Sequence, residues 1–225
     1  MTMKGSGPTE QGDQGYYLAR PQSGVGKPVL VLHAWWGLNP FVQGFCDRLA
    51  AEGFIALAPD LYHGAVAATI AQAETLSAKL DPTAVERALA KAVAQLKAVP
   101  GVQARKVGVV GFSLGGFWAM WLTKQESSPI AAAVVFYATR ADDYAGSQAA
   151  YQFHLAETDP YEPPSEVEAI KSRLKSAGKR AVFYTYPGTT HWFFEDDRTD
   201  AYRAEAAALA WKRAVDFLRM HLGEI

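Results

Sequence analysis

The sequence predicts an α/β fold, with a mostly parallel sheet of about seven strands and helices on both of its faces. Short apolar segments rich in Val, Ile and aromatic residues alternate with amphipathic helical patterns, which is typical of parallel strands connected by helices. Most of these segments are apolar on both sides, as strands covered on both faces should be. A chain of 225 residues suits one such domain, which we expect at 15–225, after a polar, loosely ordered segment at 1–14.

The expected elements follow one another along the chain. The expected strands are Gly15–Ala19, Pro28–His33, Phe54–Ala58, Lys106–Gly111, Ile130–Tyr137, Tyr151–Ala156 and Ala181–Tyr186. The expected helices lie at about 41–52, 83–98, 115–125, 163–177 and 201–221. Ligands of such sheets bind at the carboxyl ends of the strands, so the residues that directly follow each strand are the candidates for chemistry.

Composition and charge narrow the classes of partner. The net charge is −1, and the Lys and Arg residues are scattered, which argues against nucleic acid as a partner. The longest apolar stretch, Ile130 to Ala138, is too short to cross a bilayer, and the first fifteen residues hold no apolar run of a secretory signal. We therefore expect no membrane partner and a cytoplasmic location. Cys46 is the single cysteine, which excludes an internal disulfide and argues against a cysteine-based metal site.

One motif indicates chemistry. Gly111-Phe112-Ser113-Leu114-Gly115 directly follows an expected strand and opens an expected helix. In that context G-x-S-x-G is the nucleophile elbow of α/β-hydrolases, a sharp turn that presents the serine hydroxyl above the sheet at the positive end of a helix dipole. A tight strand–helix connection without a catalytic role is the alternative. We predict that Ser113 is a nucleophile that attacks a carbonyl carbon.

A serine hydroxyl needs a base, and the base needs an acid that orients it. In α/β-hydrolases the chain order is nucleophile, acid, histidine. Of the five histidines, two precede Ser113, one lies within an expected strand and one lies within the last expected helix. His191 alone stands in a loop after a late strand, so we predict that it is the base. A surface-loop histidine is the alternative.

The acid is less well determined by the sequence. Asp159 lies just past the strand Tyr151–Ala156, on the loop before the strand that leads to the histidine, and this position fits the triad geometry. Glu157 stands closer to the same strand, and Asp142 and Asp143 follow the strand before it. Each of these could be an ordinary turn carboxylate, since Asp before Pro is common in turns. We favour Asp159.

An oxyanion hole needs two backbone N–H groups aimed at the developing negative charge. Leu114, the residue after the nucleophile, is expected to supply one, and Trp35, in the loop after Pro28–His33, the other. Aromatic residues near the expected strand ends could line an apolar pocket for the substrate or could belong to the core. These candidates are Trp35, Trp36, Tyr137, Trp192 and Phe193.

With these residues placed, the chain resembles the dienelactone hydrolase family. The resemblance covers Gly15 to Leu222 and rests on the elbow, Leu32-His33-Ala34-Trp35-Trp36-Gly37, Ala58-Pro59-Asp60-Leu61-Tyr62, Thr158-Asp159-Pro160, Tyr186-Pro187-Gly188 before His191, and the closing stretch Arg198 to Leu218 with Trp211. It implies a compact domain without a large lid, no metal and no organic cofactor. It also implies Ser113, Asp159 and His191 as the triad.

Two departures from the family's founding members concern the site. Those members carry cysteine where this chain has Ser113, and glutamate where it has Ala34. The glutamate is thought to hold and activate the thiol. A hydroxyl that histidine activates during attack does not need this carboxylate, whose charge would also oppose an oxyanion. The two changes together indicate an ordinary serine esterase site.

A third departure concerns the substrate. Relatives that cleave dienelactone hold its carboxylate with two arginines, but here the stretch Tyr62 to Val85 has no arginine. Four residues after His191 stands Glu195, in an acidic run that we expect to be a solvated loop, and Arg198 is the nearest positive candidate. We therefore expect a preference for uncharged substrates.

These inferences predict an esterase or lactonase that cleaves a small-molecule carboxylic ester through an acyl-enzyme intermediate, as a monomer or a small homo-oligomer. A serine peptidase or amidase of the same fold is one alternative. A catalytically silent hydrolase-fold binding protein is another.

Overall fold

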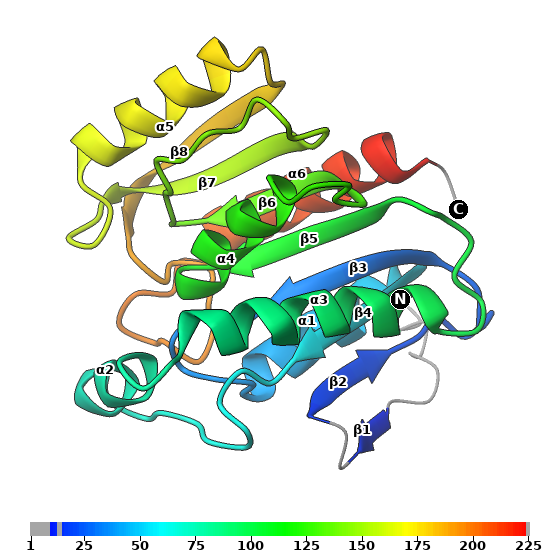
Figure 1. Cartoon of the computed structure of the whole chain (residues 1–225). Coiled ribbons are helices and arrows are strands. Elements are labelled where there is room, and N and C mark those ends of the chain that lie inside the picture. Colours follow the sequence, from blue (N-terminus) through cyan, green and yellow to red (C-terminus); the bar gives the residue numbers. More distant parts are fainter. Residues whose placement is uncertain (1–9, 13–14, 224–225) are drawn as a thin grey trace. The chain divides into compact units, whose positions relative to one another are not determined.

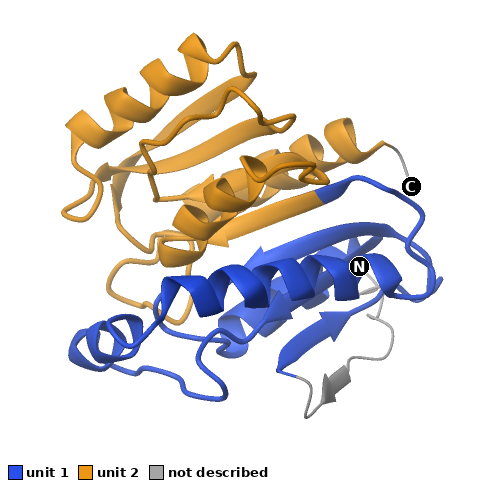
Figure 2. Cartoon of the chain, in the orientation of Figure 1, with its two compact units in different colours: residues 1–107, 225 blue, residues 108–224 orange. Residues whose placement is uncertain are grey.

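A computed structural model describes residues 10–12 and 15–223, in which strands and helices alternate along the chain (Figure 1). The chain forms two compact units that meet in sequence at Val107 and Gly108 (Figure 2). Unit 1 covers the described residues up to Val107, and unit 2 covers those from Gly108. None of the helices formed by the described residues has the length and apolar character that a membrane crossing needs.

Unit 1 contains four strands in the order β1-β2-β4-β3. β3 and β4 pair in parallel, whereas β2 pairs with β4, and β1 with β2, in antiparallel orientation. β4 is buried along its whole length and β3 along nearly all of it, as the apolar sequence of each strand predicts. The elements are β1 (Glu10–Gly12), β2 (Tyr16–Ala19), β3 (Lys27–Leu32), α1 (Pro40–Ala51), β4 (Phe54–Pro59), α2 (Ile70–Ser77) and α3 (Pro82–Ala98).

The two long helices of unit 1 begin at the same local signal. Asn39 precedes Pro40 at the start of α1, and Asp81 precedes Pro82 at the start of α3. Each capping side chain accepts a backbone N–H of the first turn, at 3.1 Å in α1 and 3.0 Å in α3. Proline suits the first helical position because its missing N–H would have no partner there.

Unit 2 contains the strands β5-β6-β7-β8 in that order. β7 pairs in parallel with both β6 and β8. Figure 1 shows α4 in front of these strands and α6 behind them, so helices cover both faces of β6. The elements are β5 (Val107–Phe112), α4 (Leu114–Thr123), β6 (Ile130–Phe136), β7 (Ala150–Thr158), α5 (Pro164–Ser176), β8 (Ala181–Thr190) and α6 (Ala204–Leu222).

Aromatic rings join the strand ends of unit 2. Phe136 of β6 stacks on Phe112 of β5 with 4.8 Å between ring centroids and on His154 of β7 at 4.5 Å, and Phe194 packs on the same ring at 4.6 Å. His154 is buried, which lowers its pKa to about 3, so its ring is neutral and part of the core. This packing holds the carboxyl ends of β5, β6 and β7 beside the segment that follows β8.

The α/β class and the mostly parallel pairing predicted from the sequence are confirmed. Every expected strand and helix is present, and the structure adds β1 and α2, which the sequence analysis did not predict. α2 buries only Ala73, so it has little apolar periodicity, and it begins at a capping box formed by Thr69 and Gln72. Of the expected irregular segment 1–14, residues 10–12 form β1, and the remainder lies outside the described residues.

β8 is longer than expected. The expected strand ended at Tyr186, but β8 continues past Pro187 and Gly188 to Thr190. Its pairing with β7 shifts in register after Ala156 and resumes at Thr158 and Thr190. Side chains satisfy backbone groups across the shift, since Glu157 Oε2 accepts the N–H of Gly188 at 2.9 Å. His191 therefore follows the end of a strand directly.

Candidate active site

Ser113 stands at a strained turn between β5 and α4. Its φ of 49° lies in the left-handed region, and its N–H donates to the carbonyl of Phe136 at 3.0 Å. A Cβ on Gly111 would lie 2.3 Å from the carbonyl oxygen of Gly115, so only glycine fits there. These features match the sharp turn predicted for a nucleophile elbow.

A chain of hydrogen bonds connects three side chains of unit 2. His191 Nε2 lies 2.9 Å from Ser113 Oγ, and His191 Nδ1 lies 2.7 Å from Oδ2 and 2.8 Å from Oδ1 of Asp159. The His191 side chain is 3% exposed and that of Asp159 is 6% exposed. An ionised carboxylate can only accept, so it fixes the proton on Nδ1 and leaves Nε2 as the acceptor for the serine O–H. The arrangement can therefore withdraw a proton from Ser113.

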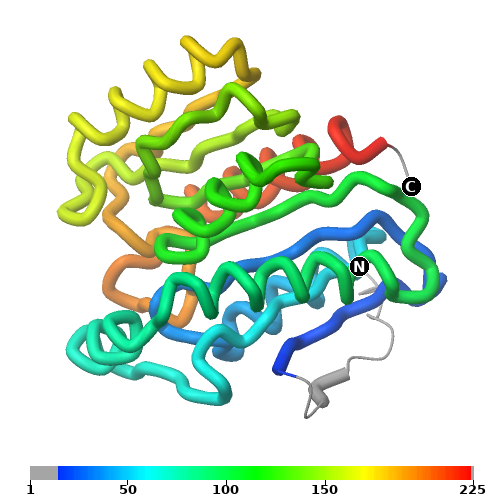
Figure 3. Tube along the Cα trace, in the orientation of Figure 1, coloured from blue at the N-terminus to red at the C-terminus, as the bar shows by residue number. Residues whose placement is uncertain are grey.

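Asp159 also organises its own loop. Its Oδ1 accepts the backbone N–H of Tyr161 at 3.0 Å and that of Glu162 at 3.2 Å. The β7–α5 connection that carries Asp159 and the β8–α6 connection that begins with His191 lie at the same end of unit 2 (Figure 3). The turn chemistry considered as an alternative for Asp159 is thus present together with the contact to His191.

Glu157 and Asp142, which were also considered as the acid, have other partners. Glu157 accepts the N–H of Gly188, as described above. Asp142 forms ion pairs with Lys124 and with Arg140, whose Nε donates at 2.8 Å. These two cations hold the pKa of Asp142 at about 2, against the opposing effect of its partial burial. The carboxylate at His191 in this structure is Asp159.

Three aromatic rings surround the His191 imidazole. Tyr137 and Tyr161 each lie 4.8 Å from it between ring centroids, and Trp192 lies 5.0 Å away in an edge-on arrangement. Tyr137 is fully buried, whereas Tyr161 is 43% exposed and Trp192 is partly exposed. One side of the imidazole thus faces the core, and another faces rings that reach the surface.

Tyr137 and Glu195 form a buried pair next to this imidazole. The tyrosine hydroxyl donates to Glu195 Oε1 at 2.7 Å. Burial raises the pKa of Glu195 to about 8, the hydrogen bond from Tyr137 lowers it in part, and the charge of Asp197 raises it further. The solvated position expected for Glu195 is wrong, because its side chain is buried and accepts the Tyr137 hydroxyl.

Three of the expected pocket residues are buried, and their role in a pocket stays a prediction. Tyr137 and Phe193 in unit 2 and Trp36 in unit 1 are buried, because aromatic rings at strand ends gain more from packing than from solvent contact. Trp192 is partly exposed beside His191, as a pocket residue would be. The side chain of Arg198 is 18% exposed and pairs with Asp197 at 3.0 Å.

The two expected oxyanion donors lie in different units. Leu114 is the first residue of α4, where backbone N–H groups have no partner within the helix. Trp35 lies in unit 1, in the loop between β3 and α1. The roles of both N–H groups stay predictions.

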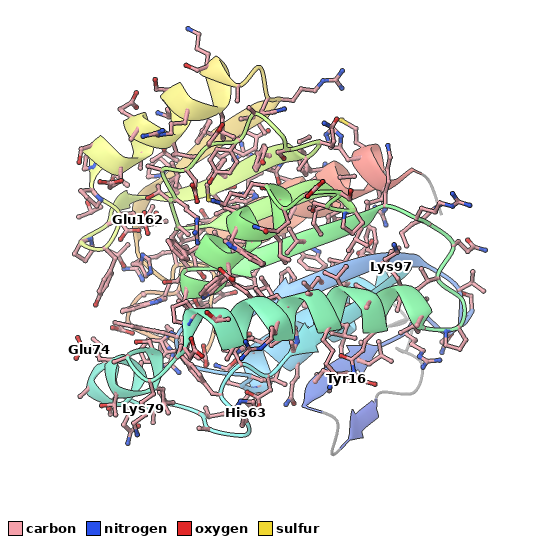
Figure 4. All side chains as sticks on the ribbon, in the orientation of Figure 1. Tyr16, His63, Glu74, Lys79, Lys97 and Glu162 are labelled. Atoms are coloured by element: carbon pink, nitrogen blue, oxygen red, sulfur yellow. The ribbon has the colours of Figure 1, made fainter. Side chains whose placement is uncertain are left out.

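A second carboxyl group with a raised pKa, that of Glu162, lies close to Asp159. Glu162, labelled in Figure 4, accepts a hydrogen bond from Thr139 Oγ1 at 2.6 Å. Burial raises its pKa to about 7, the Thr139 hydrogen bond opposes this shift, and the charge of Asp159 adds to it. This carboxyl therefore loses its proton at a higher pH than an ordinary glutamate does.

Comparison with known protein families identifies the family of the chain. The model of the "Dienelactone hydrolase family" matches residues 15–222. The chain belongs to the dienelactone hydrolase family. This is a family of hydrolases, and the fold described above agrees with this assignment.

Relatives of this dienelactone hydrolase family member are known in sequence and in structure. A protein of Aquifex aeolicus named "Putative carboxymethylenebutenolidase" is 32% identical over 217 residues, which cover 92% of this chain and 93% of the relative. A Bradyrhizobium protein named "Probable 2-oxo-3-(5-oxofuran-2-ylidene)propanoate lactonase" is 28% identical and covers 92% and 89% of the two chains. The solved "Putative Dienelactone Hydrolase" of Klebsiella pneumoniae has a TM-score of 0.79 at 26% identity, over 90% of this chain and 91% of its own.

Sequence reasoning missed three residues beside the candidate triad of this family member. Tyr161 stands two residues after Asp159, and its place in the same turn could have indicated proximity to His191. Thr139 and Glu162 lie far apart in the sequence, so no local pattern could have paired them. Glu195 was noticed but placed in solvent, because an acidic run is usually a surface feature.

Proposed function

We propose that this dienelactone hydrolase family member cleaves small carboxylic esters or lactones through Ser113, His191 and Asp159. The observation that carries the proposal is the continuous hydrogen-bonded chain from Asp159 through His191 to the strained Ser113. Strain and pre-formed hydrogen bonds at one position are typical of a functional site. The lactonase and carboxymethylenebutenolidase names of the relatives support this substrate class.

The proposed reaction proceeds in two halves. Ser113 Oγ attacks the carbonyl carbon while His191 Nε2 takes the hydroxyl proton, and backbone N–H groups, that of Leu114 among them, stabilise the oxyanion. The intermediate collapses, the C–O bond to the leaving group breaks, and His191 returns the proton to the leaving oxygen. Water then attacks the acyl-enzyme with the same proton transfers and releases the carboxylic acid.

The test combines a variant with covalent labelling. Ser113→Ala should lower kcat for a p-nitrophenyl ester by about 10⁵- to 10⁶-fold while the protein stays folded, because the nucleophile of a triad is lost. A fluorophosphonate probe should add one label to the native chain at Ser113 and none to the variant. A variant that kept a tenth of the activity would overturn the proposal, and so would a native chain that neither reacts with the probe nor cleaves any ester.

Cys46 supplies the control for a thiol mechanism. Its side chain is buried in α1, and burial raises the pKa of the thiol, so it should not react in the native protein. Activity should survive iodoacetamide, and Cys46→Ala should keep the activity of the native chain. Loss of activity in proportion to alkylation would contradict the serine mechanism.

A further inference from the structure

Two of the rings next to His191 reach the surface and touch each other. Tyr161 and Trp192 have their centroids 5.3 Å apart, and each lies within 5.0 Å of the imidazole centroid. Tyr161 is 43% exposed, and Trp192 is partly exposed. We call this pair the Tyr161–Trp192 face. It is an aromatic surface adjoining the base of the candidate triad.

Backbone geometry holds both rings in place. Trp192 has a φ of 67°, in the left-handed region that a bulky residue rarely adopts. Five non-glycine residues of the described chain have a positive φ, and Ser113, Tyr137 and Trp192 are three of them. Such conformations persist only where the surroundings enforce them, and they concentrate at functional sites. The N–H of Tyr161 donates to the Asp159 carboxylate that also holds His191, so one group positions the imidazole and this ring together.

The position of the face determines which part of a substrate it meets. In the proposed reaction His191 Nε2 delivers its proton to the leaving oxygen, so the leaving alcohol lies on the histidine side of Ser113 Oγ. The substituent on that oxygen then lies next to the rings that adjoin the imidazole. Aromatic rings prefer other aromatic rings in offset or edge-to-face contact, beyond what buried area alone provides.

We propose that the Tyr161–Trp192 face is a subsite for the leaving group and that it favours an aromatic or other planar group over a saturated one. This inference rests on the proposed ester hydrolysis and specifies its substrate class. It concerns the alcohol side of the ester, so it sets no requirement on the acyl group.

The test compares two esters whose leaving alcohols carry either an aromatic or a saturated six-membered ring. Benzyl acetate and cyclohexylmethyl acetate share an acyl group and have leaving alcohols of similar size and basicity. In the native enzyme, kcat/KM should be higher for the benzyl ester. Tyr161→Ala should lower the benzyl-to-cyclohexylmethyl ratio of kcat/KM by about two- to twelvefold, since an aromatic pair contributes about 0.5–1.5 kcal/mol. Tyr161→Phe keeps the ring, so it should keep the ratio.

A binding measurement separates the face from the chemistry. Benzyl alcohol should inhibit the native enzyme more strongly than cyclohexylmethanol, and Tyr161→Ala should reduce this difference. A ratio that is unchanged in Tyr161→Ala, with both esters still cleaved, would overturn the subsite and leave the proposed function intact. A native enzyme that cleaves neither these esters nor a p-nitrophenyl ester would overturn the proposed function instead.

Discussion

The hydroxyl of Tyr137 donates a 2.7 Å hydrogen bond to Oε1 of Glu195, and both side chains are fully buried. The ring of Tyr137 packs on the His191 imidazole, so this pair forms the inner support of the candidate base. Asp196, Asp197 and Arg198 are the charged neighbours of the Glu195 carboxyl within its own loop, and burial outweighs them all in shifting its pKa.

The stability of the protein should depend on the ionisation of Glu195. Its folded-state pKa of about 8 lies above the value of about 4.3 expected in an unfolded chain. Between these values the folded state binds more protons than the unfolded state, so stability falls as the pH rises through this window. The free energy of unfolding should fall by at most about 1.4 kcal/mol per pH unit from this group. The Glu195→Gln variant cannot ionise and keeps an acceptor for Tyr137, so it should lack this fall.

Urea unfolding of both proteins at pH 5, 6.5 and 8 checks this expectation. The variant should gain stability relative to the native chain as the pH rises. A difference between the two proteins that stays constant from pH 5 to pH 8 would show that Glu195 is ionised throughout.

Asp159, Glu157 and Asp142 should respond differently to neutral replacement. Asp159→Asn keeps the size of the side chain but can hold His191 in the wrong tautomer, so kcat should fall by about 10⁴-fold. Glu157→Gln and Asp142→Asn should change kcat only slightly, because those carboxylates bind Gly188 and the Lys124–Arg140 pair. A crippling effect of Asp142→Asn with a mild effect of Asp159→Asn would assign the acid to the loop after β6.

The elbow should tolerate no side chain at Gly111. A Cβ there would overlap the backbone carbonyl of Gly115, so Gly111→Ala should prevent the turn and destabilise the fold by about 2–5 kcal/mol. Gly146→Ala is the matched control, since a Cβ at that position meets nothing within 4 Å. It should change stability by no more than about 1 kcal/mol. Urea unfolding measures both, and equal stability of the two variants would contradict the close approach at the elbow.

Substrate charge should affect turnover. Asp197 already pairs with the guanidinium of Arg198, and a paired cation attracts a substrate carboxylate less strongly. We expect the ratio of kcat/KM for dienelactone to that for a neutral lactone to lie below one. Glu195 no longer supports this expectation, because it is buried. A ratio well above one that falls in Arg198→Gln would identify Arg198 as a carboxylate-binding residue.

The order of elements was predictable because apolar runs and helical periodicity are local signals. The buried strands β5 and β6 are almost entirely apolar, so each stands out in the sequence. The end of β8 was not predictable, because it depends on hydrogen bonds to a residue distant in sequence. Glu157 of β7 accepts the N–H of Gly188 with its side chain, and its own N–H donates to the Thr189 hydroxyl. α2 was missed for a different reason, because it buries only Ala73 and so shows little apolar periodicity.

The candidate triad residues were found from motif order, a rule about the fold and not about the side chains. The packing and burial of the side chains around these residues were not predictable from the sequence. Whether an aromatic residue faces substrate or core depends on packing partners distant in sequence, as Tyr137 and Tyr161 show by lying equally close to His191 with opposite exposure. The raised pKa of Glu195 follows from burial, which an acidic run does not reveal.

The hydrogen bonds that join Ser113, His191 and Asp159 all lie within unit 2. For laboratory evolution, Gly108 therefore divides the chain into a part without these three residues and a part that contains them all. Libraries that diversify loops before this point change no side chain of the hydrogen-bonded set, so they leave the residues of the proposed proton transfer as they are. Libraries in the loops after β7 and β8 mix changes in specificity with changes in the chemistry itself, and their inactive members are correspondingly harder to interpret.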